Sequence, residues 1–297
     1  MRFNATFGST ITTDIQQSEQ ALQTALQQVS TGKRVNLPSD DPAASAALVQ
    51  SLNQSANVDQ YTANATAASS QAQSGDSVLS SVVSLLNKAI TLGTEGANGT
   101  TSAADRASIA SQVNGLLASV ASEANTTYQG VALFGGTANS GPAFVADAAS
   151  PDGYTYAGNT GINYIAVGDT LKVQVNVPGS QIFTQPGASA LGSLQQLATA
   201  LTSGTTAQIG AATAAVTSAL SYVSEQHAVY GNAVNQFASQ EDFLSQESVT
   251  LKSQQTSLVG IDTATAAETL AQAEAQNSEL LAAAAKVLPT TLLDYLK

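Results

Sequence analysis

The chain has 297 residues, enough for a sizeable core, but only 10% of them are charged and the net charge is −12. This balance argues against nucleic acid and against an acidic membrane surface, because binding to either requires clustered Lys and Arg. The sequence contains no cysteine, which excludes disulfides and thiolate chemistry. No apolar run approaches the roughly 18–20 residues of a membrane span. We expect no membrane insertion and, from the polar N-terminal stretch, no cleaved signal peptide.

The first predicted element is a helix over residues 9–31. Its apolar and small residues recur at alternating spacings of four and three, the heptad pattern of a helix that packs against a partner helix. Gly32 then favours the left-handed conformation that ends helices. The residues of this stripe are Ile11, Ile15, Ser18, Leu22, Ala25 and Val29.

The stretch RVNLPSDDPAAS, residues 34–45, is interpreted as a joint between two helices. Pro38 keeps the residue before it out of the helical conformation. Asp41 is a good N-cap, and Pro42 suits the first helical position, where its missing N–H costs nothing. With Gly32 in front, these residues predict a helix end, a short turn and a new helix start.

The adjacent carboxylates of Asp40 and Asp41 are also typical of an acid/base pair or a metal site. Consecutive helical residues point about 100° apart, however, and do not converge on one atom. We therefore expect both side chains to start the second helix, with Asp40 adding negative charge at its positive end.

A second helix is predicted over residues 42–92, with a glycine-rich loop at 93–101. Ser102 followed by Asp105 resembles a capping box, and starts a third helix that extends to about residue 127.

The pattern changes in the middle of the chain. The segment YQGVALFGGT predicts a turn or hairpin, and residues 154–179 read as strands separated by turns. Leu171, Val173, Val175 and Val177 alternate with polar residues, as expected for a half-buried strand.

After a short predicted helix at 189–202, apolar residues recur every seventh position from Ile209 onward. Such a repeat predicts one long helix that packs in coiled-coil fashion. The seam continues through Val216, Val223, Tyr230, Phe237, Leu244, Leu251 and Leu258.

A last helix follows Gly260. A buried Asn277 in its stripe would fix the register of a helix pair, whereas an Asn277 at the wet edge of the stripe would have no such role. Because each terminal stripe lacks a local partner, the economical arrangement pairs the two terminal helices with each other. The C-terminal stripe consists of Leu270, Ala273, Asn277, Leu280, Ala284 and Val287.

These patterns predict a mainly α protein: a long, coiled-coil-like helical bundle formed by the N- and C-terminal segments, with a small β-rich module inserted in the middle. The expected parts are terminal helices at 1–40 and 260–297, a helical body at 41–139 and 188–259, and an outer module at 140–187.

Candidate catalytic residues are few. His227, the one histidine, lies at a polar companion position of the long seam, and we expect a packing role for it. No HExxH, CxxC, GxSxG or phosphate-loop pattern occurs. Asp147, Asp152 and Asp169 would bind Ca²⁺ only if their loops converged. We predict no catalytic site, metal site or cofactor; a secreted enzyme or binding module with its site at 140–187 is the weaker alternative.

Three segments together resemble the flagellin family. QQVSTGKRVNLPSDDPAAS (27–45) is similar to the N-terminal signature of that family, YQGVALFGG to the hairpin that follows, and the ending ETLAQAEAQNSELLAAAAKVLPTTLLDYLK to its C-terminal helix. The middle module carries no comparable signature. The resemblance implies a structural subunit of the bacterial flagellum, with terminal helices that become ordered on assembly.

Two roles within the family fit: the filament subunit itself, and an adaptor that joins hook to filament. The segments PSDDPAAS, LFGG and LLDYLK and the modest middle module favour the adaptor. The resemblance implies as partners other copies of the chain, a neighbouring hook-associated junction protein, flagellin and an export chaperone. It also implies an extracellular location, reached through the flagellar type III export channel.

Overall fold

The computed structural model describes residues 5–293, and side chains for residues 9–286. The chain forms two compact units: residues 1–57 with 247–297, and residues 58–246. Each unit is described by itself below.

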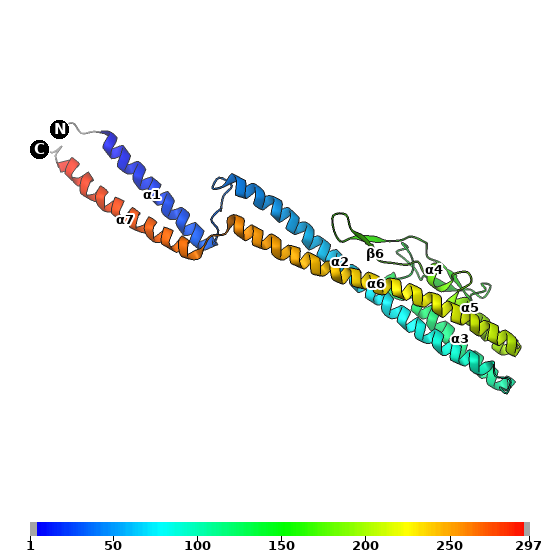
Figure 1. The fold of residues 1–297 in the computed structure, drawn as a ribbon. Helices are drawn as coiled ribbons and strands as arrows, with labels where there is room; N and C mark the ends of the chain where they lie inside the picture. The colour runs from blue at the N-terminus through cyan, green and yellow to red at the C-terminus, as the bar shows by residue number, and fades with distance from the viewer. Residues whose placement is uncertain (1–4, 294–297) are drawn as a thin grey trace. The chain divides into compact units, whose positions relative to one another are not determined.

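The terminal unit contains the predicted pair of end helices. Helix α1 (Ala5–Thr31) and helix α7 (Thr263–Leu293) pack side by side (Figure 1). The beginning of α2 (Pro42–Gly96) and the end of α6 (Thr206–Val259) complete the unit. The predicted pairing of segments far apart in sequence is confirmed.

The second unit is a helical body. It contains the rest of α2 and α6, together with α3 (Ala103–Ala124) and α5 (Ala190–Ser203). One continuous core joins the four helices. The hydroxyl oxygen of Ser102 accepts a hydrogen bond from the backbone N–H of Asp105 at 3.1 Å, as the predicted cap requires. Ser102 also donates to the Asp105 carboxylate at 2.6 Å.

Helix α2 extends past the predicted end at residue 92. Gly93 and Gly96, which were expected to open a loop, are buried inside the helix. A Cβ at Gly93 would overlap Thr213 of α6, and one at Gly96 would overlap Leu201 of α5. Glycine therefore serves close helix packing at both positions, and the loop begins only afterwards.

The β-rich part consists of three separate two-stranded antiparallel sheets, β1–β2, β3–β4 and β5–β6. Their short strands are joined by turns, and Gln129 and Gly130 both have positive φ in the predicted tight hairpin. The elements are β1 (Thr127–Tyr128), β2 (Val131–Ala132), β3 (Phe144–Ala146), β4 (Tyr154–Tyr156), β5 (Tyr164–Ala166), β6 (Lys172–Gln174) and the short helix α4 (Gly179–Phe183).

The predicted strand over 171–177 is shorter in the structure, where only β6 pairs with β5, in the register Ile165 to Val173. Asn176 ends it, because its side-chain amide donates to the carbonyls of Gly136 at 3.0 Å and Gly161 at 3.1 Å. Alternation identified the buried side chains of Val173, Val175 and Val177 correctly, but the prediction is wrong for Leu171, which lies before β6 and is 46% exposed.

The module packs on the two long helices of its unit. Tyr61 of α2 donates to Asp169 at 3.1 Å, Asn64 donates to the Ala166 carbonyl at 2.9 Å, and Gln240 of α6 donates to the Val167 carbonyl at 2.9 Å. Beneath it, the rings of Phe134, Phe144 and Phe183 stack edge to face, at centroid distances of 5.2 and 5.6 Å.

The two compact units divide α2 and α6 at other places than the predicted parts do. Residues 41–57 and 247–259, expected in the helical body, group with the terminal helices in the first compact unit.

By length and composition alone α2 is apolar enough to cross a membrane, with a mean hydropathy of 1.2 over 18 residues. Leu79, Val82 and Leu86 of the same helix are fully buried in the core of the second unit.

Candidate assembly site: the terminal helix pair and its joint

The seam between α1 and α7 is built from small residues. Its buried apolar members are Ala25 of α1 and Ala266, Ala273 and Ala284 of α7. Among the expected stripe residues, Ile11, Ile15, Leu22, Leu270 and Leu280 are only half-buried. Val29 remains 43% exposed, and the side chain of Val287 lies outside the described residues.

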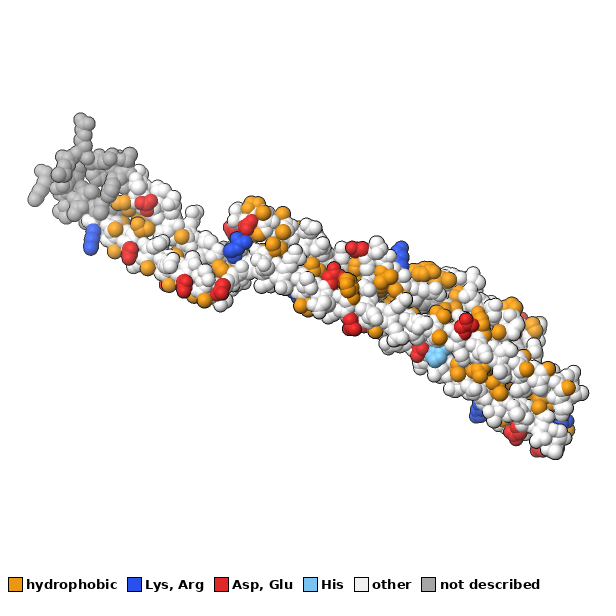
Figure 2. Space-filling model, in the orientation of Figure 1, with side chains coloured by type: hydrophobic (Ala, Val, Ile, Leu, Met, Phe, Trp, Pro, Cys, Tyr) orange, Lys and Arg blue, Asp and Glu red, His pale blue; other side chains and the backbone are white. Residues whose placement is uncertain are grey.

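The terminal pair therefore leaves much of its apolar surface uncovered. Leu26 and Leu281 are each about half exposed, besides the half-buried stripe residues. Figure 2 shows that charged side chains are few on the visible face and that uncharged polar and hydrophobic groups dominate it. Such a surface can be covered by protein without desolvating many charges.

Asn277 lies within the seam and is only 8% exposed, so the wet-edge interpretation is wrong. Among the described residues, no hydrogen bond holds the Asn277 side chain. The hydroxyl oxygen of Ser18 in α1 is fully buried and also lacks a partner among the described residues.

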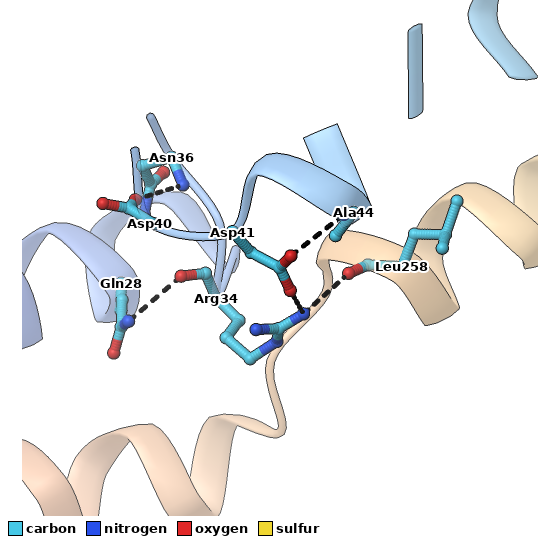
Figure 3. Close-up of polar contacts among 7 residues, drawn as sticks. All are labelled: Gln28, Arg34, Asn36, Asp40, Asp41, Ala44 and Leu258. Atoms are coloured by element: carbon cyan, nitrogen blue, oxygen red, sulfur yellow. Dashed lines mark hydrogen bonds and ion pairs between the residues drawn. The ribbon is translucent and has the colours of Figure 1, made fainter. Parts of the chain in front are cut away.

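The joint begins and ends as the sequence predicts. Gly32 follows α1 with φ of +66°, and its N–H donates to the Gln28 carbonyl at 2.9 Å. The Asp41 carboxylate caps α2 by accepting from the Ala44 N–H at 3.0 Å (Figure 3). Pro42 is the first residue of that helix, and Pro38 lies in the turn before it.

Asp40 differs from the expectation that it supports the start of α2. Its Oδ2 accepts from the backbone N–H of Asn36 at 3.0 Å (Figure 3) and from that of Leu37 at 2.8 Å. Asp40 therefore ties the preceding turn together, while Asp41 alone caps the helix. The two adjacent carboxylates point to different partners, as their spacing implied, because each is held by its own backbone donors.

Arg34 bonds to both sides of the joint, a role that its place after the first helix did not predict. Its Nη2 donates to Asp41 Oδ2 and to the carbonyl of Leu258, both at 3.1 Å (Figure 3). The cap bond from Ala44 first, and the Arg34 guanidinium second, hold the pKa of Asp41 below its ordinary value. The sequence carried only a weak signal for this role, a basic residue seven positions before an N-cap. The second partner could not be found from local spacing, because Leu258 lies 224 residues away.

The two connecting segments also bond through their backbones. Arg34 N–H donates to the Val259 carbonyl at 2.7 Å, and Ile261 N–H donates to the Gly32 carbonyl at 3.2 Å. A small separate core of Val35, Ala44 and Val259 lies beside these bonds.

The long seam of α6 is buried along nearly its whole length. Of the residues that the heptad pattern names, Val216, Val223, Tyr230, Phe237, Leu244 and Leu251 are buried and Leu258 is half-buried. His227 lies beside this seam, and its Nε2 is 3.0 Å from Oδ1 of Asp76 in α2, a contact between helices that fits a packing role.

The candidate calcium carboxylates do not converge. Asp147 accepts from Thr155 at 2.8 Å, Asp152 from Ser189 at 2.8 Å, and Asp169 from Tyr61. Across residues 5–293, no group of three or more His, Cys, Asp or Glu side chains is placed to hold a metal ion. Each of these carboxylates has a structural partner instead.

The fold and the site define a helical protein in which the N-terminal helix α1 packs against the C-terminal helix α7 and a short joint connects α1 to α2. A β module is inserted between the N-terminal and C-terminal halves of the sequence. Models of the bacterial flagellin N-terminal and C-terminal helical regions match residues 6–139 and 213–296 respectively. The chain belongs to the flagellin family.

Similar proteins within this family carry hook-associated names. The chain is 45% identical over 102 residues to flagellar hook-associated protein 3 of Escherichia coli K12; the aligned segment covers 34% of this chain and 32% of that protein. The crystal structure of the flagellar junction protein FlgL from Legionella pneumophila matches with a TM-score of 0.60 and 17% identity, over 71% of this chain and 100% of that one. FlgL of Bacillus cereus matches with a TM-score of 0.60 and 20% identity, over 71% and 99%. At such low identities, the two matches show that this chain has the same fold as the two FlgL structures.

Proposed function

We propose that this protein is a structural adaptor of the bacterial flagellum that joins the hook to the filament through its paired terminal helices. The observation that carries the proposal is the α1–α7 pair, whose alanine seam leaves Ile, Leu and Val side chains partly uncovered. A helix pair of this kind gains its stability by packing against further helices, because isolated short helices are marginal in water. The local similarity to hook-associated protein 3 and the FlgL fold support the same role.

In this role the partly covered stripe residues contact neighbouring subunits. The partners are other copies of the chain, the neighbouring hook-associated protein on one side and flagellin on the other, with an export chaperone before assembly. The protein acts outside the cell after passage through the flagellar export channel, and has no enzymatic activity. Its stripe residues are Ile11, Ile15, Leu22, Val29, Leu270, Ala273, Leu280, Ala284 and Val287.

The filament subunit is the second candidate, since the same two family models describe flagellin. A seeding experiment separates the two roles. Purified protein is added to short filament seeds and the length of new filament is measured by electron microscopy, with flagellin as the positive control. An adaptor adds a limited layer and stops, whereas growth of long filaments would assign the filament role.

Truncation tests whether the terminal pair carries assembly. Chains lacking residues 1–35 or 262–297 should fail to enter the flagellum, because each deletion removes one partner of the α1–α7 pair. Circular dichroism of the purified truncations is the control, and should retain the helical signal of residues 58–246. Normal incorporation of either truncation would contradict the proposed function.

A further inference from the structure

The α1–α7 seam by itself selects its register weakly. Its buried residues other than Asn277 are alanines, which offer little shape by which one alignment is preferred to another. Both stripes also repeat at intervals of seven residues, so sliding one helix by seven places equivalent positions opposite each other. In such a slip Ala273 takes the place of Ala266 and Leu280 that of Ala273, and Asn277 is the polar residue that changes place, with Leu270.

The polar residues of the seam do not fix the register within one chain either. A buried polar group specifies register when it meets a matched partner. Among the described residues, no hydrogen bond holds the Asn277 side chain, and the Ser18 hydroxyl oxygen is buried without one. The alignment of the two helices must therefore be set outside the seam.

Arg34 is positioned to set it. Its carbonyl accepts from Gln28 Nε2 in the last turns of α1 at 3.1 Å, and its guanidinium reaches the N-cap Asp41 of α2 and the Leu258 carbonyl at the end of α6 (Figure 3). Its N–H bonds to Val259, only a few residues before α7 begins at Thr263. One residue thus links the end of α1 to the segment from which α7 starts.

We propose that Arg34 is the positioning residue that fixes the register of the terminal helix pair. Its side chain locks the two connecting segments together, and the length of each connector then determines where α7 begins opposite α1. The inference deepens the proposed function, because a neighbouring subunit can recognise the partly covered stripes only if their relative register is constant.

The test uses cysteine pairs in the full-length chain, which has no cysteine of its own. Lys33 lies opposite Gly260 in an antiparallel bridge, and both helices rise equally per residue. Leu22 therefore lies near the level of Leu270 and most of a heptad away from Asn277. Leu22→Cys with Leu270→Cys reports the native register, and Leu22→Cys with Asn277→Cys reports a slipped one.

Three substitutions are compared in both reporter backgrounds. Arg34→Met removes the guanidinium and keeps the aliphatic stem. Asp41→Asn keeps an N-cap oxygen for Ala44 but removes the charged acceptor of Arg34. Lys33→Met is the matched control, because it makes the same change one residue earlier, where only the backbone takes part in the bridge.

Cross-links are measured after mild oxidation, in the purified protein and in isolated flagella. Arg34→Met and Asp41→Asn should each lower the ratio of native to slipped product by about fivefold, the scale of a partly exposed ion pair. Lys33→Met should leave the ratio unchanged, and Arg34→Lys should restore part of it, because the ammonium keeps charge and donors.

Two results would overturn the proposal. One is an unchanged ratio in Arg34→Met. The other is the absence of the Leu22–Leu270 product in both preparations of the otherwise unsubstituted chain, which would remove the register itself. Failure of the protein to join hook and filament would instead leave the cross-links of the purified chain intact, so the two proposals fail separately.

Discussion

Tyr230 lies where α6, α2 and the β module of the second unit meet. The heptad pattern assigned it to a seam, and its ring is indeed buried against the core. Its hydroxyl does more, because it accepts the backbone N–H of Val177 at 3.1 Å in the module. One residue therefore serves both the helix seam and the attachment of the insertion, and only the first task follows from spacing.

Removal of this hydroxyl tests the attachment. Tyr230→Phe keeps the ring but leaves the buried Val177 N–H without an acceptor, which should cost about 1–3 kcal/mol of unfolding free energy. Urea denaturation followed by circular dichroism measures it. Wild-type stability despite loss of the hydroxyl would mean that Val177 finds another acceptor.

The same substitution changes the response to alkaline pH. Burial raises the pKa of Tyr230 to about 12, from an ordinary value near 10. The folded protein therefore holds this proton more tightly than the unfolded chain, and its stabilising contribution is complete below about pH 10 and lost between about pH 10 and 12. The fall in stability over that window should be smaller in Tyr230→Phe, measured by denaturation at stepwise pH. An equal fall in both proteins would assign the effect to other tyrosines.

Glycine in a helix has opposite meanings at two positions of this unit. A Cβ at Gly75 of α2 would overlap the Tyr230 ring, whereas nothing lies within 4 Å of one at Gly115 of α3. Gly75→Ala should destabilise the protein by about 1–3 kcal/mol through overpacking. Gly115→Ala, the matched control, should stabilise it by about 0.5–1 kcal/mol through helix propensity. Thermal unfolding of both variants checks the difference in sign; a stabilising Gly75→Ala would contradict the close approach.

At the scale of elements, two phenylalanines of α6 differ in burial according to their position relative to the seven-residue repeat. Phe237 occupies the seven-residue repeat and is fully buried, while Phe243 lies off the repeat and is 60% exposed. Phe237→Ala should cost about 3–5 kcal/mol, and Phe243→Ala should stay within about 0.5 kcal/mol of wild type. Chemical denaturation of the pair measures how strongly the seam, rather than hydrophobicity as such, stabilises the helix. Similar losses in both variants would show that the repeat does not identify the core side of α6.

The helix ends show how far local chemistry reaches. Gly32, Ser102 and Asp41 each act within three or four residues along the chain, and all three were identified by residue type and spacing. Asp40 was misassigned because two acceptable donors, the turn and the helix end, lie within its reach. Sequence patterns do not decide between two such sets of donors. In the structure Asp40 accepts from the turn, because two backbone N–H groups of the turn converge on one carboxylate oxygen.

At the scale of the whole molecule, the two units differ in what their helices bury. The α1–α7 seam buries mainly alanines, whereas the α2 segment at 58–96 contributes Leu79, Val82 and Leu86 to the core of its unit. Because the terminal pair removes less apolar area from water, we expect that separating α1 from α7 requires less free energy than opening the core of the second unit.

Hydrogen exchange on the free monomer checks this difference. Amides of residues 9–31 should exchange much faster than those of residues 58–90, and limited proteolysis should cut on the N-terminal side of the joint. Assembly into flagella should slow exchange in α1, which is the internal control for the same peptides. Equal protection of both segments in the monomer would contradict a terminal pair that depends on assembly.

The sequence by itself determined the long helices, their order and most of their seam positions, because periodicity at 3.5 residues reports which side of a helix must leave water; the short helix α4 was not predicted. It also determined the caps at Gly32 and Asp41, since these bonds are made within a few residues. Only the tertiary structure decided that Arg34 bonds to Leu258, that Tyr230 holds Val177, and that Gly93 and Gly96 stay inside a helix. Each of those outcomes depends on a partner distant in sequence, and no local pattern encodes which partner arrives.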